Sequence, residues 1–216
     1  MSQVERFTLE AENAPGTGVP TKEGTVKNPV PLAEGESRQT TKVTDRIPGN
    51  VTFYTYSSLS EDPSEEPSTV SSNDFFTGKK VVLFGIPGAF TSICSSKHVP
   101  QFNEKFEELK NTGVDAIACT SVNDAYCLRE WFRTLKVDPS KITILADPTG
   151  AFHRALGLTQ DLPELGERCL RYAMFVRDRE VQILNVEEPG GKAYKVSGPE
   201  KMLKDLGEWK ARNPEQ

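Results

Sequence analysis

One cysteine, Cys94, stands in the segment PGAFTSICSSKHVP, which runs from Pro87 to Pro100 directly after the apolar run VVLFGI. The apolar run predicts a buried strand, and the residues after it predict the first turn of a helix. Backbone N–H groups at the start of a helix lack partners within it and carry a partial positive charge. A thiol held there is stabilised in its thiolate form, so the segment predicts a nucleophilic cysteine.

The residues around Cys94 could serve the same chemistry. Pro87 and Gly88 end the strand abruptly, and Thr91 lies three residues before the cysteine. That spacing can bring the Thr91 hydroxyl and the sulfur to one small cavity, where the hydroxyl can bind an oxygen atom of a ligand. Pro100 lacks an N–H group, and we expect it to bend the helix that follows Cys94.

Other interpretations of these residues are available. A free cysteine is often a small buried hydrophobic side chain, although the polar flanks TSICSSKH suit a site that solvent can reach. His98 lies one helical turn after Cys94, so the two could form the pair of a cysteine hydrolase, but no oxyanion site is evident. We expect His153 on the surface of a short helix. Two distant histidines give no support to metal catalysis.

Composition limits the classes of function. The chain has 216 residues and a formal net charge of −5, which gives no basic surface for nucleic acid or an anionic membrane. The spacings of Cys94, Cys119, Cys127 and Cys169 match neither paired disulfides nor a zinc site. Apolar runs are too short for a membrane span, and the N-terminal residues resemble no targeting peptide. We expect a soluble, cytoplasmic protein.

The front of the chain divides into two parts. Residues 1–42 are rich in Gly, Pro, Thr, Glu and Lys and almost free of aromatic residues. Such a segment buries little apolar surface, so we predict a disordered tail over 1–42 and a single domain over 43–216. Residues 51–56 (VTFYTY) predict a strand. Residues 57–72 predict a polar surface loop.

From Lys79 onward, strands and helices alternate. Strands are predicted over 79–86, 114–122 and 141–147, because each contains a continuous apolar run. A helical stripe formed by Val99, Phe102, Phe106 and Leu109 follows the first of these strands. Further helices are predicted over 125–135, capped by Asn123 or Asp124, and over 151–158.

The C-terminal part predicts a hairpin and a helix. Residues 169–176 and 180–187 read as two strands joined by a tight turn, and Ser197 with Glu200 suggests a capping box before a helix over 201–209. Strands alternating with helices, followed by a hairpin and a helix, predict an α/β fold with a mixed central sheet flanked by helices. This order is that of a thioredoxin-like fold.

These residues resemble a known family. The pattern Pro87-x-x-x-Thr91-x-x-Cys94 is similar to the active-site motif of the peroxiredoxins, and VVLFGIPGAFTSICSSKHVP resembles the fifth-class, or type II (atypical), group. The segments CTSVNDAY, LADPTGAFHRALGL and LRYAMFV resemble further segments of that group in the same order. The resemblance covers about Val43 to Trp209. One departure is Ser92, where the family commonly has proline.

The resemblance implies a thiol-dependent peroxidase without a cofactor. Cys94 would be the peroxidatic nucleophile, whose thiolate attacks a peroxide oxygen, expels water or an alcohol and becomes a sulfenic acid. Thr91 would hold the peroxide by a hydrogen bond. Arg171, from LRYAMFV, would stabilise the thiolate and the negative charge on the oxygens. Pro87 would shape the pocket and shield the sulfur.

The resemblance weakens at the step that regenerates the enzyme. Many relatives carry a resolving cysteine between the last strand and the last helix, but EPGGKAYKVSGPE contains none, and the matching place falls near Val196. Cys119 resembles a second cysteine of plant members, yet it and Cys127 could be packing residues. Cys169 should share a strand face with Arg171, two residues away. We therefore expect a one-cysteine cycle completed by an outside thiol, either glutathione with glutaredoxin or thioredoxin.

Two further expectations concern partners. The relatives form homodimers through the loops around the active site, and exposed Phe90 and Ile93 could supply apolar contacts, so we expect a homodimer. The substrates would be hydrogen peroxide and alkyl hydroperoxides. A reactive cysteine on the same fold could instead serve as a peroxide sensor that passes its oxidation to another protein.

Overall fold

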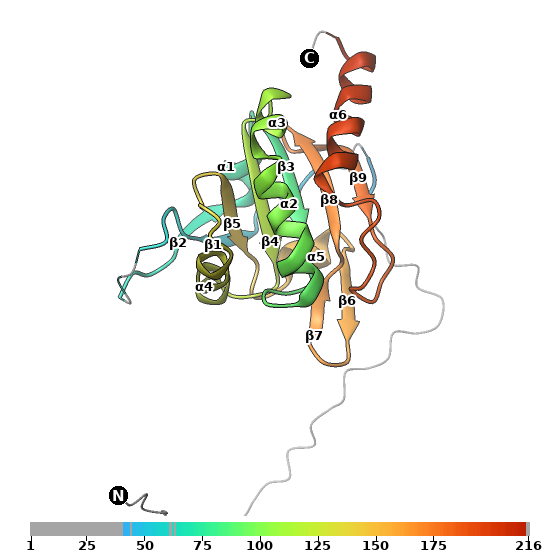
Figure 1. Ribbon diagram of the computed structural model, residues 1–216. Helices are drawn as coiled ribbons and strands as arrows, with labels where there is room; N and C mark the ends of the chain where they lie inside the picture. The colour runs from blue at the N-terminus through green and yellow to red at the C-terminus, as the bar shows by residue number, and fades with distance from the viewer. Residues whose placement is uncertain (1–40, 44, 61, 63, 215–216) are drawn as a thin grey trace, which may run out of the picture. The chain divides into compact units, whose positions relative to one another are not determined.

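A seven-stranded mixed sheet forms the centre of the protein, whose computed structural model describes residues 41–43, 45–60, 62 and 64–214 (Figure 1). The strand order is β2-β1-β5-β4-β3-β8-β9. β3, β4 and β5 are parallel, whereas the other neighbouring pairs are antiparallel. The strands are β1 (Thr52–Thr55), β2 (Ser68–Ser71), β3 (Lys80–Gly85), β4 (Ala116–Ser121), β5 (Ile142–Ala146), β8 (Tyr172–Arg177) and β9 (Glu180–Val186).

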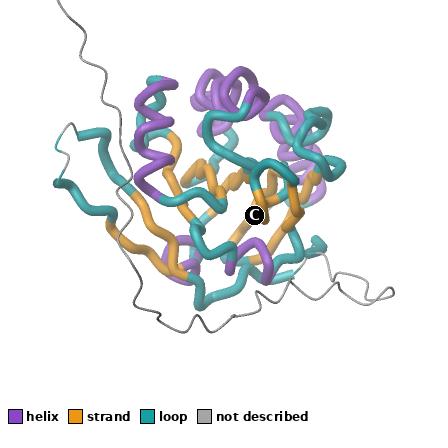
Figure 2. The backbone as a smooth tube through the Cα atoms, turned by 90° about the horizontal axis from the view of Figure 1, so that it is seen from below, coloured by secondary structure: helices purple, strands orange, loops and turns teal. Residues whose placement is uncertain are grey.

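Helices cover both faces of this sheet (Figure 2). The α-helices are α1 (Ser72–Phe76), α2 (Val99–Glu104), α3 (Phe106–Asn111), α4 (Ala125–Leu135), α5 (Ala151–Ala155) and α6 (Pro199–Arg212). A π-helical turn, η1 (Cys94–His98), precedes α2. Helices α2, α3, α4 and α6 share one apolar core, while α1 and α5 share the core on the opposite face. In the described residues, no helix combines the length and apolar character needed to cross a lipid bilayer.

The central strands are apolar on both sides because each side meets a layer of helices. In β3, Val82 and Phe84 belong to the core under α2 and α4, whereas Val81 and Leu83 belong to the core over α1 and α5. Alternate residues of a strand point to opposite faces, so a strand in this position needs a continuous apolar run. The thioredoxin-like α/β fold with a mixed sheet is therefore confirmed, and the predicted central strands and the helix over 125–135 are present.

The N-terminal tail predicted over residues 1–42 lies outside the described residues except for its last two positions. Of these, Thr41 is buried, and both its N–H and its hydroxyl donate to the Leu156 carbonyl, at 2.8 and 2.7 Å. Thr41 is thus attached to the end of α5.

The prediction of a polar loop over residues 57–72 is wrong at its C-terminal end. Residues Ser68–Ser71 form β2, in which Val70 pairs with Phe53 of β1. Ser71 then caps α1 by accepting a hydrogen bond from the Asp74 N–H, at 3.0 Å. An edge strand is paired on one side only and tolerates polar residues, so the composition of this segment concealed it.

The predicted capping box of the last helix is also wrong. Helix α6 begins at Pro199 with Gly198 as its N-cap, and no side chain caps it. Ser197 instead donates its hydroxyl hydrogen to Glu187, at 2.9 Å. A proline at the first helical position needs no hydrogen-bond partner for its nitrogen, which makes a side-chain cap less necessary there.

Two hairpins complete the fold. The predicted hairpin β8–β9 is confirmed, and Asp178 and Arg179 form its two-residue turn with positive φ angles of 44° and 68°. A second hairpin was not predicted: β6 (Thr159–Leu162) pairs with β7 (Gly166–Cys169) as a separate two-stranded sheet. This second hairpin lies beside the loop after β3, since a Cβ atom on Gly88 would stand 3.8 Å from the Leu165 side chain.

Candidate active site

The strand β3 leads directly into the segment that carries Cys94. Helical structure begins at Ser92, and the Thr91 carbonyl accepts the first helical hydrogen bond, from the Ser95 N–H, at 3.0 Å. Cys94 is therefore in the first turn, as the sequence predicted. The turn that follows is π-helical, with the Val99 N–H bonded to the Cys94 carbonyl. A π-turn is rare and often marks a functional site.

The Cys94 side chain faces the interior. Its exposed fraction is 0%, whereas its neighbours Ser96 and Lys97 are exposed. The expectation that solvent reaches this position is therefore wrong for the sulfur in this structure. The polar flanks that suggested it lie on the outer side of the same turn.

Arg171 makes direct contact with the Cys94 sulfur. Its Nη1 donates to the Cys94 Sγ at 3.3 Å and also approaches the His98 Nδ1 at 3.1 Å. Its Nη2 donates to the Gly191 carbonyl at 2.9 Å and its Nε to the Ala193 carbonyl at 3.1 Å. The guanidinium is almost fully buried. The structure therefore brings together two of the four predicted site residues, Cys94 and Arg171. The loop after β9 fixes the orientation of the guanidinium.

His98 supports the guanidinium rather than the sulfur. Its Nε2 lies 3.0 Å from the Ser197 carbonyl, so Nε2 carries the hydrogen and Nδ1 accepts from Arg171. Burial, followed by the charge of Arg171, lowers the pKa of His98 to about 3, although the Ser197 carbonyl acts in the opposite direction. The imidazole is neutral at physiological pH and both its nitrogens are occupied. It is therefore not placed to act as the base of a cysteine hydrolase.

Thr91 and Pro87 lie on the loop in front of the helix. The Thr91 hydroxyl donates to the Gly88 carbonyl at 2.8 Å, and the hydrogen bonds of the described residues include none from it to the sulfur. Pro87 is buried, and its ring lies close to Gly191, where a Cβ atom would stand 3.9 Å away. The proline therefore packs against the residue whose carbonyl orients Arg171.

Asn123 is a site residue whose role the sequence did not indicate. Its Oδ1 accepts hydrogen bonds from the Ala89 N–H and from the Ser121 hydroxyl, each at 2.9 Å. This contact ties the loop after β3 to the end of β4. The sequence suggested Asn123 or Asp124 as a helix cap, and Asp124 takes that role by accepting from the Cys127 N–H at 2.8 Å.

The remaining cysteines are free thiols. Burial raises the pKa of Cys119 in β4 well above its ordinary value, and it also raises the pKa of the half-buried Cys127 in α4. The prediction that Cys169 shares a face with Arg171 is wrong. Cys169 ends β7 and donates its S–H to the Ile86 carbonyl at 2.9 Å, in the core of the opposite face. Burial raises its pKa as well.

The prediction of a surface position for His153 is also wrong. Its exposed fraction is 0%, and its Nδ1 lies 2.8 Å from the Oδ2 of Asp147, which is itself buried. Helix α5 has only five residues. So short a helix provides no periodic pattern from which its buried side can be read.

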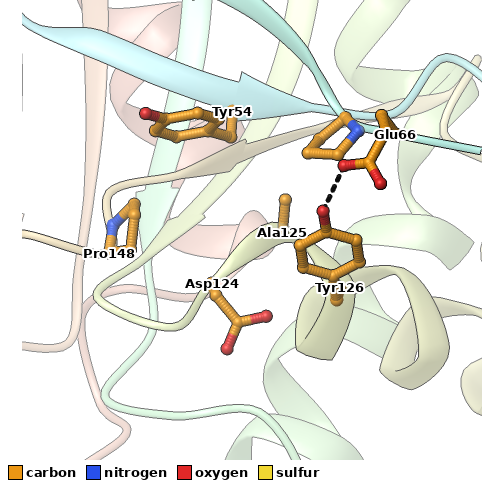
Figure 3. Close-up of a pocket in the computed structure, with 7 residues that line it drawn as sticks. Tyr54, Glu66, Asp124, Ala125, Tyr126 and Pro148 are labelled. Carbon is orange, nitrogen blue, oxygen red and sulfur yellow. Dashed lines mark hydrogen bonds between the residues drawn. The ribbon is translucent and has the colours of Figure 1, made fainter.

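An open pocket of about 320 Å³ is lined by other residues than Cys94, Arg171, Thr91 and Pro87 (Figure 3). It is formed where β1 and the segment before β2 approach the start of α4, and the Tyr126 hydroxyl at its side donates to the Glu66 carboxylate. The lining residues are Tyr54, Glu66, Pro67, Asp124, Ala125, Tyr126 and Pro148.

Comparison with known proteins supports the sequence resemblance. The Redoxin family model matches residues 42–203. The chain is 42% identical over 172 residues to "Peroxiredoxin-2E-2, chloroplastic" of Oryza sativa subsp. japonica, covering 77% of this chain and 73% of that protein. It is 41% identical over 167 residues to "Peroxiredoxin-2B" of Arabidopsis thaliana, covering 76% of this chain and 97% of that protein.

Comparison with a solved structure indicates the same family. The crystal structure of reduced Prx3 from Vibrio vulnificus in complex with hydrogen peroxide matches with a TM-score of 0.68 and 35% identity. The match covers 77% of this chain and 99% of that chain. The chain therefore belongs to the peroxiredoxins, which are thiol-dependent peroxidases, and within them to the type II group.

Proposed function

We propose that Cys94 is the peroxidatic nucleophile, with Arg171, Thr91 and Pro87 as its supporting residues. The observation that carries this proposal is the 3.3 Å hydrogen bond from Arg171 to the Cys94 sulfur at the start of a helix. A guanidinium and the positive end of a helix both favour a thiolate over a thiol. The crystal structure of the Vibrio vulnificus relative supports hydrogen peroxide as a substrate, and alkyl hydroperoxides are proposed beside it.

The chemical step is a displacement at oxygen. The Cys94 thiolate donates an electron pair to one peroxide oxygen, and the O–O bond breaks. The second oxygen leaves with that bond's electrons and takes a proton to become water or an alcohol. Sulfur is oxidised to the sulfenic acid and the peroxide is reduced. Arg171 stabilises the charge that grows on the leaving oxygen, and the Thr91 hydroxyl turns from the Gly88 carbonyl to hold the peroxide.

A turnover assay on wild type and Cys94→Ser tests this function. We expect the wild type to consume many equivalents of hydrogen peroxide per protein when a thiol reductant is present, and the variant to consume none above background. Consumption of a single equivalent with every reductant would instead indicate a peroxide sensor. Retained turnover in Cys94→Ser would contradict the assignment of the nucleophile.

We propose a one-cysteine cycle in which an outside thiol reduces the sulfenic acid. The loop from Glu188 to Gly198 contains no cysteine, and burial keeps Cys119 and Cys169 in their protonated, weakly nucleophilic form. Separate assays with glutathione and glutaredoxin and with thioredoxin identify the reductant. Mass spectrometry of peroxide-treated protein without reduction should find no internal disulfide. A stoichiometric bridge from Cys94 to another cysteine would contradict the one-cysteine cycle.

We propose that the protein is a homodimer that associates through the loops around the active site. Phe90, next to Thr91, exposes 57% of its surface, a large fraction for an aromatic side chain. Sedimentation at tens of micromolar should give the mass of two chains, and a monomer would contradict the proposal. A cytoplasmic location stays a prediction, because the similar plant proteins include forms named as chloroplastic and mitochondrial.

A further inference from the structure

The carboxylate of Glu187 lies where β9 ends and is almost fully buried. Its Oε1 accepts hydrogen bonds from the backbone N–H groups of Lys195 and Val196, each at 2.7 Å, and of Ser197, at 2.9 Å. It also accepts the Ser197 hydroxyl at 2.9 Å. Four donors from three consecutive residues thus meet on one oxygen atom, and they bend residues 188–198, here called the Glu187 loop, back onto the strand.

The Glu187 loop holds Arg171, which contacts the Cys94 sulfur, and His98, which contacts Arg171. Its Gly191 and Ala193 carbonyls accept hydrogen bonds from Arg171. Its Ser197 carbonyl accepts a hydrogen bond from the Nε2 of His98. The other ring nitrogen of this neutral imidazole, Nδ1, accepts a hydrogen bond from Arg171. Among the described residues, the hydrogen bonds that orient the guanidinium, other than the one to the sulfur, go to this loop or to His98, which the loop holds.

Glu187 also holds the backbone of the arginine itself. Its N–H donates to the Arg171 carbonyl at 2.9 Å, across the end of the β8–β9 hairpin. The carboxylate fixes the far end of the loop, while the backbone N–H fixes its near end to Arg171. A continuous path of hydrogen bonds runs from the carboxylate through Ser197, His98 and Arg171 to the Cys94 sulfur.

We propose that Glu187 is a positioning residue of the peroxidase, whose carboxylate shapes the Glu187 loop so that its carbonyls aim Arg171 at the Cys94 sulfur. This inference rests on the proposed function of Cys94 and Arg171. Turns and bends, rather than a helix or strand, make up the loop, so side-chain contacts must define its shape. A second contact of this kind is the Gln160 Oε1, which accepts the Gly190 N–H at 2.7 Å.

The ionisation of Glu187 fits this role. Burial acts to raise the pKa of Glu187, but the hydrogen bonds from Val196, Ser197 and Lys195 together lower it below its ordinary value. The carboxylate is therefore charged at neutral pH. Hydrogen bonds to a charged acceptor are in general stronger than those between neutral groups, and the distances of 2.7–2.9 Å to the Glu187 Oε1 are compatible with such bonds.

The test compares Glu187→Ala and Glu187→Gln with wild type. Asp115→Ala is a matched control, because the Asp115 carboxylate also accepts a backbone N–H, from Lys80 at 2.7 Å, outside the active site. Three quantities are measured: kcat/KM for hydrogen peroxide, the temperature of unfolding, and the pH profile of Cys94 alkylation by iodoacetamide, followed by mass spectrometry of the Cys94 peptide.

We expect Glu187→Ala to lower kcat/KM by about 10- to 100-fold, the loss that follows when a catalytic group is poorly oriented. Its alkylation profile should move to higher pH, because a displaced guanidinium no longer stabilises the thiolate. Glu187→Gln keeps a neutral acceptor of the same shape and should recover most of both properties. Asp115→Ala should leave kcat/KM and the profile unchanged.

An unmoved alkylation profile in a folded Glu187→Ala variant would overturn the inference, even if its unfolding temperature falls, since the residue would then be merely structural. If Glu187→Ala does not fold, Glu187→Asp replaces it, because the shorter carboxylate keeps the charge but not the reach, and the same shift is expected. Failure of the proposed function is distinguishable. It appears as a lack of turnover in wild type, whereas failure of this inference appears as an unmoved profile in an active enzyme.

Discussion

Arg171 shows how much of the site depends on the shape of one side chain. Its Nη1 faces both the Cys94 sulfur and His98, while its other two nitrogens end on backbone carbonyls of the Glu187 loop. A planar group with several fixed donors can satisfy all these partners at once. An ammonium group of equal charge cannot, because its three hydrogens diverge from a single atom.

Arg171→Lys should therefore be a severe change although it conserves the charge. We expect kcat/KM for hydrogen peroxide to fall by about 100-fold or more, comparable to the loss of one donor to a developing oxyanion. Steady-state peroxidase kinetics measures the effect. A loss of less than about threefold would show that charge alone, rather than directed hydrogen bonds, is what the reaction needs.

His98 makes stability depend on pH. Its pKa falls from 6.5 to about 3 on folding, so between these values the unfolded chain binds a proton that the folded protein does not. The folded state is thus fully stabilised above pH 6.5 and loses this contribution as pH falls, by about 1.4 kcal/mol per pH unit. Urea unfolding at pH 7.5, 6 and 5 should show this slope. His98→Gln should flatten it, and an equal slope in the variant would assign it to other groups.

The residues proposed to react can be read from the sequence, but the groups that support Arg171 cannot. Cys94 and Thr91 lie in one short segment, so their spacing already indicated the chemistry. The support for Arg171 joins it to His98, which is 73 positions away, and His98 to Ser197, which is 99 positions away. An irregular loop provides no periodic signal for such contacts. The positions of Glu187 and Ser197 therefore needed the structure.

At the scale of elements, two adjacent residues at the start of α4, Asn123 and Asp124, have different roles. Asp124 caps the helix through the Cys127 N–H, whereas Asn123 reaches across to the Ala89 N–H of the loop before Cys94. Asp124 therefore stabilises its own helix, and Asn123 fixes the active-site loop, which is residues 86–91 between β3 and the helical turn of Cys94. From the sequence alone, Asn123 and Asp124 are alternatives for one role, the N-cap of α4.

Substitution of each residue should separate these roles. Asp124→Ala removes a helix cap and should lower the free energy of unfolding by about 1 kcal/mol with little change in kcat/KM. Asn123→Ala should lower kcat/KM by about 10-fold, because the loop before Cys94 loses its attachment. Urea unfolding and peroxidase assays check both. The opposite pattern, with activity lost in Asp124→Ala alone, would contradict this division.

The predicted secondary structure is correct where the hydrophobic pattern of a segment is strong. The strands β3, β4 and β5 are apolar on both faces, so their sequences are continuous apolar runs. The hairpin β6–β7 was missed because its strands TQDL and GERC are short and carry charged residues. Its place beside the active-site loop follows from tertiary packing, which local sequence does not encode.

At the scale of the whole molecule, the proposed one-cysteine cycle gives the chemistry to one of the four free thiols and none to the other three. If the one-cysteine cycle holds, a variant with Cys119→Ala, Cys127→Ala and Cys169→Ala should retain turnover within about threefold when the outside thiol is saturating, because the chemistry of Cys94 is intact. Its unfolding temperature should fall, since two of the three residues fill the core. Loss of turnover after one oxidation of Cys94 would show that one of them is the resolving thiol.

Phe90 combines its exposure with a φ angle of 60°, a conformation that bulky L-residues rarely adopt. Within one chain a glycine would relieve this strain, whereas the aromatic ring packs only partly against its own chain. We expect Phe90→Gly to leave the unfolding free energy of the monomer unchanged or to raise it by up to about 1 kcal/mol. Self-association, measured by sedimentation, should weaken. A large loss of monomer stability would show that the ring packs in the core of its own chain. The expected result would mean that the strained backbone at Phe90 holds the ring in position to contact a second molecule.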